Sequence, residues 1–197
     1  LALMLATARR VVFQTTQLRS GVWKTPDNLY LRGRTLGILG VGPIGAEMAR
    51  LAQAIGMRVQ AWTFHPSEER AKALGIRFVE RDELLRTSEV VSIHVKLTSE
   101  TRGMIGAREI ALMKPGALLI NTARGAIVDT PTLVEALHSG HLGGAGIDVF
   151  DVEPITADHP LLACQQVVLT PHVADQNPEG FEILNRGAVD NVLAFLD

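Results

Sequence analysis

The chain has 197 residues, a formal net charge of −2, an apolar fraction of 47% and one cysteine. The charges are dispersed, so nothing indicates a nucleic-acid partner or an anionic membrane surface, and no apolar run approaches the roughly 18 residues that cross a bilayer. Cys164 has no partner for an internal disulfide, which fits the reducing cytoplasm. The length suits one large domain with an ample core.

The first 34 residues predict a helix followed by an arm. Leu1–Leu18 has the apolar spacing of an amphipathic helix, and no Ser, Asp or Asn precedes it as a cap. We therefore expect that the chain was cut from a longer protein. Ser20–Arg34 reads as a polar connector that contains Trp23 and Tyr30.

From residue 35 onward, short apolar runs alternate with helical patterns. The predicted strands are Thr35–Leu39, Arg58–Trp62, Val90–Val95, Ala117–Asn121, Gly144–Val149, Val167–Leu169 and, more weakly, Ile76–Val79. The predicted helices are Ile44–Ile55, Ser67–Leu74, Arg81–Arg86, Ala107–Met113, Thr132–Ser139 and Pro178–Leu196. This alternation predicts an α/β fold of the Rossmann-like type, a doubly wound parallel sheet with helices on both faces.

A glycine-rich turn lies between the first predicted strand and the helix after it. Gly40, Gly42 and Gly45 fit the G-x-G-x-x-G pattern, with Pro43 and Ile44 between them. The glycines would give a tight turn, a close backbone approach to a pyrophosphate and close helix–strand packing. Pro43 suits the first helical turn, where free N–H groups and the helix dipole hold phosphate. The motif predicts a dinucleotide site.

The residue after the second strand bears on the choice between NAD and NADP. An acidic residue there would bond the adenosine ribose and repel a 2′-phosphate, but this chain has Thr63. No arginine follows immediately, and His65 and Arg70 are either substitutes for it or solvated surface groups. NAD is the expected cofactor, and NADP stays open.

Three residues that follow predicted strands can supply acid–base chemistry. Arg124 can clamp a carboxylate and polarise the adjacent carbonyl, and His172 can give or take a proton near neutral pH. Glu153 would bond the second imidazole nitrogen, select its tautomer and stabilise the imidazolium. Asp148, at the end of its strand, is a candidate for holding the nicotinamide carboxamide. The remaining histidines read as surface or structural groups: His65, His94, His138, His141 and His159.

In their order along the chain, these motifs resemble the NAD-binding domain of the D-isomer-specific 2-hydroxyacid dehydrogenases, over nearly the whole chain. The carrying segments are Gly40–Gly45, Met113–Gly116, Asn121–Asp129, Asp148–Pro154 and Thr170–His172. The resemblance implies that Arg124 binds the substrate's carboxylate and carbonyl, that Glu153 orients the histidine, and that His172 shuttles the proton. The substrate would be a small 2-oxo or D-2-hydroxy acid.

The resemblance also implies a division of the chain into segments and further contacts with the cofactor. Residues 1–197 would form the dinucleotide-binding domain, with residues 1–34 as an interdomain helix and arm that join a homodimer, and residues 35–197 as the Rossmann core plus a C-terminal helix. The segment Val95–Thr98 would line the nicotinamide side. The further cofactor contacts expected are Val95, Leu97, Thr122 and Ala123.

Three departures from the family pattern limit what the resemblance implies about the coenzyme, the contacts beside the histidine and the substrate site. Thr63 replaces the usual acid, Val173–Asn177 replaces a glycine-rich stretch after the histidine, and the substrate domain, which would precede Leu1, is absent. The fragment alone is therefore expected to be inactive. Two alternatives stay open, namely phosphite-type oxidation and an NAD-sensing module like the corepressors built on this fold. Formate dehydrogenases carry Gln at the position of Glu153, which argues against them.

Overall fold

The computed structural model describes residues 1–196, and its centre is a parallel sheet of seven strands. The strands are β1 (Thr35–Leu39), β2 (Arg58–Trp62), β3 (Arg77–Phe78), β4 (Val90–Ile93), β5 (Ala117–Asn121), β6 (Leu142–Ile147) and β7 (Val167–Leu169). Their order is β3-β2-β1-β4-β5-β6-β7. The chain runs from β1 outward to β3 and then returns to place β4 on the other side of β1. This reversal creates the crevice in which doubly wound folds bind ligands.

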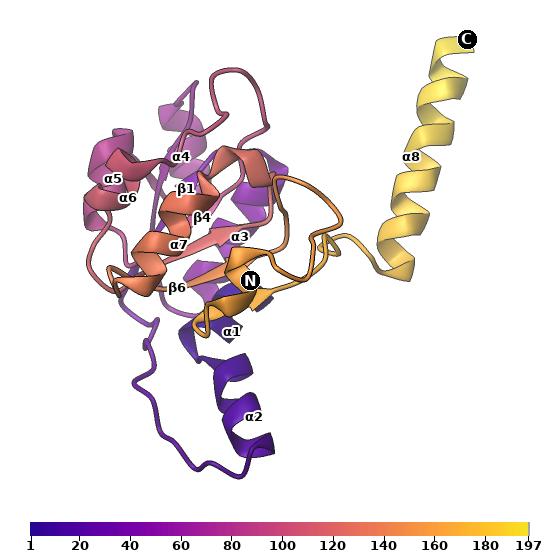
Figure 1. Cartoon of the computed structure of the whole chain (residues 1–197). Helices are drawn as coiled ribbons and strands as arrows, with labels where there is room; N and C mark the ends of the chain where they lie inside the picture. Colours follow the sequence, from indigo (N-terminus) through magenta and orange to yellow (C-terminus); the bar gives the residue numbers. More distant parts are fainter. Residues whose placement is uncertain (197) are drawn as a thin grey trace.

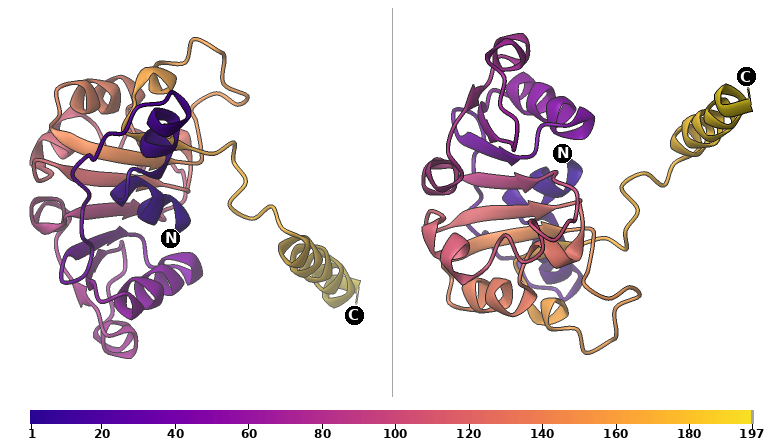
Figure 2. Two further views of the ribbon diagram at one scale, coloured as in Figure 1. Left: turned by 90° about the horizontal axis from the view of Figure 1, so that it is seen from below. Right: turned by 90° about the horizontal axis from the view of Figure 1, so that it is seen from above.

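Helices cover both faces of the sheet, as Figures 1 and 2 show. One face carries α1 (Ala2–Ala8), α3 (Pro43–Ala54) and α4 (Glu68–Leu74). The other carries α5 (Arg81–Thr87), α6 (Ala107–Leu112) and α7 (Thr130–His138). Each layer encloses its own apolar cluster, because a sheet buried on both sides needs apolar residues facing both ways. The predicted fold class is confirmed.

The start of the chain differs from the prediction. Instead of one helix over Leu1–Leu18, the structure has α1 and a separate α2 (Val11–Arg19). They meet at Arg10, whose φ of 49° lies in the left-handed region and breaks the helical path. The break lets α1 lie flat on β6, where a Cβ on Gly146 would come within 3.0 Å of the Leu3 Cβ. This packing overrides the helical pattern of the sequence.

Smaller differences concern where elements end. The predicted strand Gly144–Val149 begins and ends two residues earlier, as β6, and the predicted strand Val90–Val95 ends at Ile93. Helix α7 begins at Thr130, because the Asp129 carboxylate accepts a hydrogen bond from the Thr132 N–H at 3.0 Å and caps the helix. Two short 3₁₀ helices were not predicted, η1 (Gly125–Ile127) and η2 (Pro160–Ala163).

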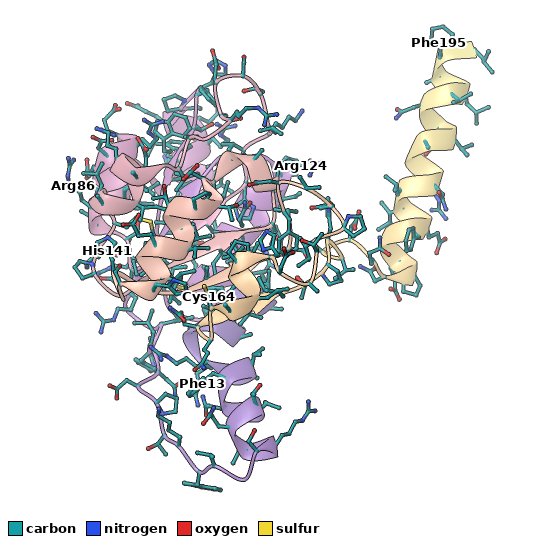
Figure 3. All side chains as sticks on the ribbon, in the orientation of Figure 1. Phe13, Arg86, Arg124, His141, Cys164 and Phe195 are labelled. Carbon is teal, nitrogen blue, oxygen red and sulfur yellow. The ribbon has the colours of Figure 1, made fainter. Side chains whose placement is uncertain are left out.

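Two segments of the described chain extend from the body. Helix α8 (Pro178–Leu196) projects away on a linker, and none of its residues is buried. Its apolar side chains, among them Phe195, stand free of the body in Figure 3. Residues 20–34 form the predicted irregular arm, in which Trp23 is 85% exposed. Among residues 1–196, no helix combines the length and apolarity that a membrane span needs.

Candidate active site

The glycine-rich loop joins β1 to α3 at the reversal of strand order. Gly40 has a φ of 96°, and a Cβ there would lie 2.8 Å from backbone atoms of His94 and Val95. A Cβ on Gly45 would come within 2.2 Å of the Gly40 carbonyl oxygen. Both positions therefore require glycine, one for the turn and one for the close contact between α3 and the loop.

The outer side of this loop is open. Gly42 is the N-cap of α3, with Pro43 in the first turn, and a Cβ added to Gly42 would meet nothing within 4 Å. Ile44 is exposed beside it. The free N–H groups at the start of this 12-residue helix thus face accessible space, which suits a phosphate. The residues present fit the pyrophosphate of a dinucleotide.

Two flanking segments border the loop. On one side, the Gly40 N–H donates to the Trp62 carbonyl at 2.8 Å, which places half-buried Thr63 beside the glycines. On the other side, Val95 is buried against Gly40, and Leu97 is half-buried against the core. The structure thus brings Thr63 and Val95, two of the predicted cofactor residues, beside the glycine-rich loop.

A buried amide, which the sequence reasoning did not single out, shapes the turn that carries Arg124. Asn121, at the end of β5, is 1% exposed. Its Nδ2 donates to the Arg124 carbonyl at 3.0 Å, and its Oδ1 accepts from the Ala123 N–H at 3.0 Å. Thr122 and Ala123 are half-buried within this turn, and Arg124 is exposed. The available signal was an amide at the end of an otherwise apolar strand, where it can close a turn.

Arg124 lies on the side of the body nearest α8 in Figure 3. Its Nη1 donates to the Ala123 carbonyl at 2.6 Å, and no carboxylate of residues 1–196 forms an ion pair with it. The next residue brings a second loop close, because a Cβ on Gly125 would lie only 2.0 Å from the Phe150 carbonyl carbon. Glycine at this position lets the arginine turn pack directly on the loop that carries Glu153.

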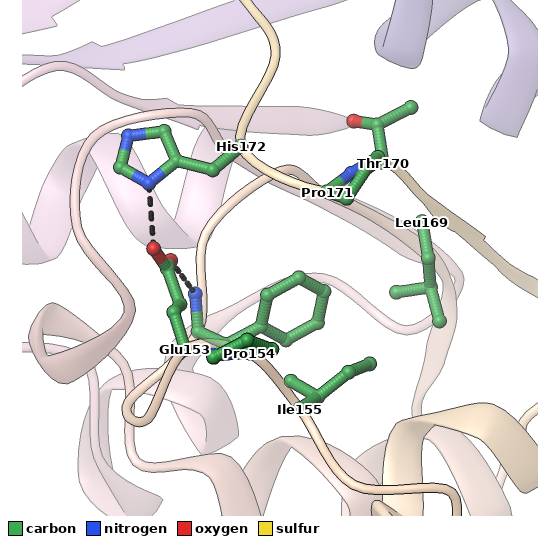
Figure 4. Close-up of a pocket in the computed structure, with 8 residues that line it drawn as sticks. Glu153, Pro154, Ile155, Leu169, Thr170, Pro171 and His172 are labelled. Carbon is green, nitrogen blue, oxygen red and sulfur yellow. Dashed lines mark hydrogen bonds and ion pairs between the residues drawn. The ribbon is translucent and has the colours of Figure 1, made fainter.

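Glu153 and His172 form the predicted pair, shown in Figure 4. The imidazole Nδ1 lies 2.7 Å from the Glu153 Oε2, and the Phe150 N–H donates to the Oε1 at 2.8 Å. The hydrogen bond from His172, followed by that from Phe150, holds the pKa of the Glu153 carboxyl below its ordinary value, and the charge of Arg124 adds to this. Glu153 is therefore an anion that fixes the imidazole, and the other ring nitrogen, Nε2, stays available for a substrate.

Asp148 organises the backbone around the histidine. Its side chain is 1% exposed, and its carboxylate accepts hydrogen bonds from the Thr170 hydroxyl and, at 3.1 Å each, from the N–H groups of Val173 and Ala174. Its carbonyl accepts from the His172 N–H at 2.7 Å. These bonds hold His172 at a φ of 56°, a left-handed conformation that costs a non-glycine residue energy. The sequence predicted a contact to nicotinamide here, and this anchoring role was not foreseen.

A pocket of about 550 Å³ opens beside the Glu153–His172 pair (Figure 4). Its lining is largely apolar and comes from two loops, the one after β6 and the one after β7. The lining residues are Phe150, Glu153, Pro154, Ile155, Leu169, Thr170, Pro171 and His172. An apolar wall beside a hydrogen-bonded pair of polar side chains is typical of sites that bind small organic molecules.

A glycine-rich strand–helix turn and a loop arginine, carboxylate and histidine at the same edge of a parallel sheet are typical of the nicotinamide-dependent dehydrogenases. Residues 1–174 match the model of the family described as "D-isomer specific 2-hydroxyacid dehydrogenase, NAD binding domain". The chain belongs to this family, as its resemblance predicted, and the family binds a nicotinamide dinucleotide.

Characterised relatives and solved structures agree with this assignment. The chain is 42% identical to a glyoxylate reductase of Korarchaeum cryptofilum and 43% identical to one of Aeropyrum pernix, in each case over 98% of this chain. The TT0316 protein of Thermus thermophilus superposes with a TM-score of 0.90 at 44% identity, covering 99% of this chain and 62% of that one. A glyoxylate reductase structure from Paecilomyces thermophila gives a TM-score of 0.91 at 36% identity, covering 98% and 58%. The chain spans about 60% of the length of the two archaeal relatives.

Proposed function

We propose that the whole protein interconverts a 2-oxo acid and a D-2-hydroxy acid, and that this chain supplies its coenzyme site and its acid–base pair. The observation that carries the proposal is the 2.7 Å contact between Glu153 and the Nδ1 of His172, at the same carboxyl edge of the parallel sheet as the open glycine-rich loop. A reduced nicotinamide dinucleotide bound at this loop would supply the hydride.

His172, Arg124 and Glu153 would transfer the proton and bind the substrate. In reduction, protonated His172 donates from Nε2 to the carbonyl oxygen, because Nδ1 is engaged with Glu153. In oxidation, the neutral tautomer keeps its hydrogen on Nδ1 and accepts the hydroxyl proton at Nε2. The exposed guanidinium of Arg124 binds the substrate carboxylate and polarises the adjacent carbonyl. Glu153 stabilises the imidazolium from which reduction starts and which oxidation produces.

The glycine loop and its borders would hold the coenzyme. Gly40, Gly42 and Gly45, with the start of α3, suit the pyrophosphate. Thr63 would border the adenosine side, Val95 borders the loop on the side of β4, and Leu97 follows it along the chain as a further proposed contact. Asp148 keeps its predicted contact with the carboxamide as a proposal, since each carboxylate oxygen can accept more than one hydrogen bond. Thr122 and Ala123 complete the set beside Arg124.

The relatives favour this enzyme over the alternatives. Those named above with a stated activity are glyoxylate reductases, which supports a small 2-oxo acid as the substrate and does not favour a corepressor or a phosphite oxidase. We further propose a homodimer formed through residues 1–34, where exposed apolar side chains including Val12, Leu18 and Trp23 gather on α2 and the arm. Cytoplasmic location stays part of the proposal.

The test is a substrate panel on the complete protein. Oxidation of NADH and NADPH would be followed by the absorbance of the reduced nicotinamide, with glyoxylate, hydroxypyruvate, pyruvate and a bulkier 2-oxo acid. We expect turnover with at least one small oxo acid. The proposal would be contradicted if the protein bound coenzyme, turned over none of the four oxo acids, and was active with phosphite alone.

A parallel assay of the 197-residue chain tests whether it binds coenzyme without catalysing the reaction. This chain should bind coenzyme without turnover, since hydride transfer needs a closed cleft and a positioned substrate. Turnover by this chain alone would show that the described residues are sufficient.

A further inference from the structure

The residue after β2 bears on whether the coenzyme site accepts a 2′-hydroxyl or a 2′-phosphate on the adenosine ribose. Gly40 donates its N–H to the Trp62 carbonyl at 2.8 Å, so the residue after Trp62 lies beside the glycine-rich loop. In dinucleotide-binding Rossmann folds a carboxylate there bonds the 2′-hydroxyl, while a nearby arginine accommodates a 2′-phosphate. This chain has Thr63, which is half-buried and carries no charge. The group that would repel a 2′-phosphate is missing at its usual place.

A guanidinium lies against the segment that joins β2 to α4. Arg70, from the first turn of α4, reaches back so that its Nη2 donates to the His65 carbonyl at 2.9 Å. Its central carbon lies 5.7 Å from the centre of the Phe78 ring, which supports the planar group from one side. These contacts tie the guanidinium to the segment that follows Thr63.

The charge of Arg70 is not neutralised within the described chain. No carboxylate of residues 1–196 forms an ion pair with Arg70, and its buried Nε lacks a hydrogen-bond partner there. Glu68 and Glu69 precede it in α4, and both are exposed, where solvent and salt weaken their repulsion of an anion. The Nη1 of this oriented guanidinium makes no hydrogen bond within residues 1–196, and a guanidinium is well suited to binding phosphate.

We propose that the coenzyme is NADP(H) and that Arg70 binds its 2′-phosphate, together with the hydroxyl of Thr63 and the imidazole of His65. This inference rests on the proposed coenzyme site and selects one of its two ligands. Arg70 is held by the backbone of the loop and by Phe78, so little of its side-chain freedom would be lost when the phosphate binds.

The test measures coenzyme binding without turnover. Dissociation constants of NADPH and NADH would be determined from coenzyme fluorescence with the 197-residue protein. We expect NADPH to bind at least about tenfold more tightly, the equivalent of one strong charge-assisted contact. Arg70→Gln should weaken NADPH binding about tenfold and leave NADH within about twofold. Lys72→Gln removes a positive charge from the same helix and should change neither.

A substitution in the opposite sense completes the design. Thr63→Asp places a carboxylate at the end of β2 and should reverse the preference, so that NADH binds more tightly than NADPH. Equal or tighter binding of NADH by the unaltered protein would overturn the inference, and so would equal losses for both coenzymes in Arg70→Gln. Failure to bind either coenzyme would instead contradict the proposed function itself.

Discussion

A histidine beside the glycine-rich loop should make the fold sensitive to acid. His94 follows β4, and its Nε2 lies 2.9 Å from the Ser92 hydroxyl. Burial lowers the pKa of His94 from its ordinary 6.5 to about 4. His94 is therefore neutral in the folded chain at neutral pH, and its backbone packs against Gly40.

The effect on stability follows from this shift. Because the folded pKa lies below the unfolded one, the unfolded chain binds the proton more readily, and stability falls as the pH falls through the window from 6.5 to about 4. Each pKa unit corresponds to about 1.4 kcal/mol, so the full loss is about 3 kcal/mol, of which about 2 kcal/mol is reached by about pH 5. This is a large share of the stability of an ordinary domain.

The assay is urea unfolding at about pH 7.5 and about pH 5, followed by circular dichroism. His94→Gln keeps an amide that can bond Ser92 and removes the titration. The variant should therefore lose about 2 kcal/mol less than the unaltered protein between the two pH values. His65→Gln, at an exposed histidine, serves as the control and should behave like the unaltered protein. Equal losses in His94→Gln and the unaltered protein would refute the reasoning.

Three further substitutions test the loops of the site. Gly125→Ala places a Cβ 2.0 Å from the Phe150 carbonyl carbon, so the two loops must separate at a cost of about 1–3 kcal/mol, measurable by urea unfolding. Asn121→Ala removes two hydrogen bonds from a buried turn and should destabilise the chain by about 1–3 kcal/mol in the same assay. Glu153→Gln removes the charge that stabilises imidazolium and should lower kcat/KM for oxo-acid reduction by the complete protein about 10- to 100-fold.

Matched control variants separate these effects from a nonspecific loss of stability or activity. Gly187→Ala lies in α8 with nothing within 4 Å of the new Cβ, and should not destabilise the chain. Glu135→Gln removes an exposed carboxylate from α7 and should keep full activity. Unchanged stability in Gly125→Ala or Asn121→Ala would show that the loops are not held as described. Full activity in Glu153→Gln would remove that residue from the mechanism.

The sequence predicted the sheet well because buried parallel strands are short continuous apolar runs. The runs at Thr35–Leu39, Arg58–Trp62 and Ala117–Asn121 match β1, β2 and β5 to the residue. The break at Arg10 was missed because no glycine or proline marks it. It arises from the fit of α1 on β6, which is a tertiary contact that local patterns do not contain.

The contact between Glu153 and His172 was easier to predict than the loops that support it. Glu153 and His172 were recognised as partners from their motifs, and the structure brings them within hydrogen-bonding distance. The roles of Asn121 and Asp148 depend on the path of loops that the sequence does not specify. Both are polar residues at the ends of apolar strands, and that position is the only local sign of their function.

The most direct test of the account is kcat/KM for 2-oxo acid reduction by the complete protein carrying His172→Ala. The account predicts a loss of at least ~100-fold, the usual cost of removing a general acid, with coenzyme affinity retained. His138→Ala, at the end of α7, should keep the original rate. Undiminished turnover in His172→Ala would contradict the assignment of His172 as the residue that transfers the proton.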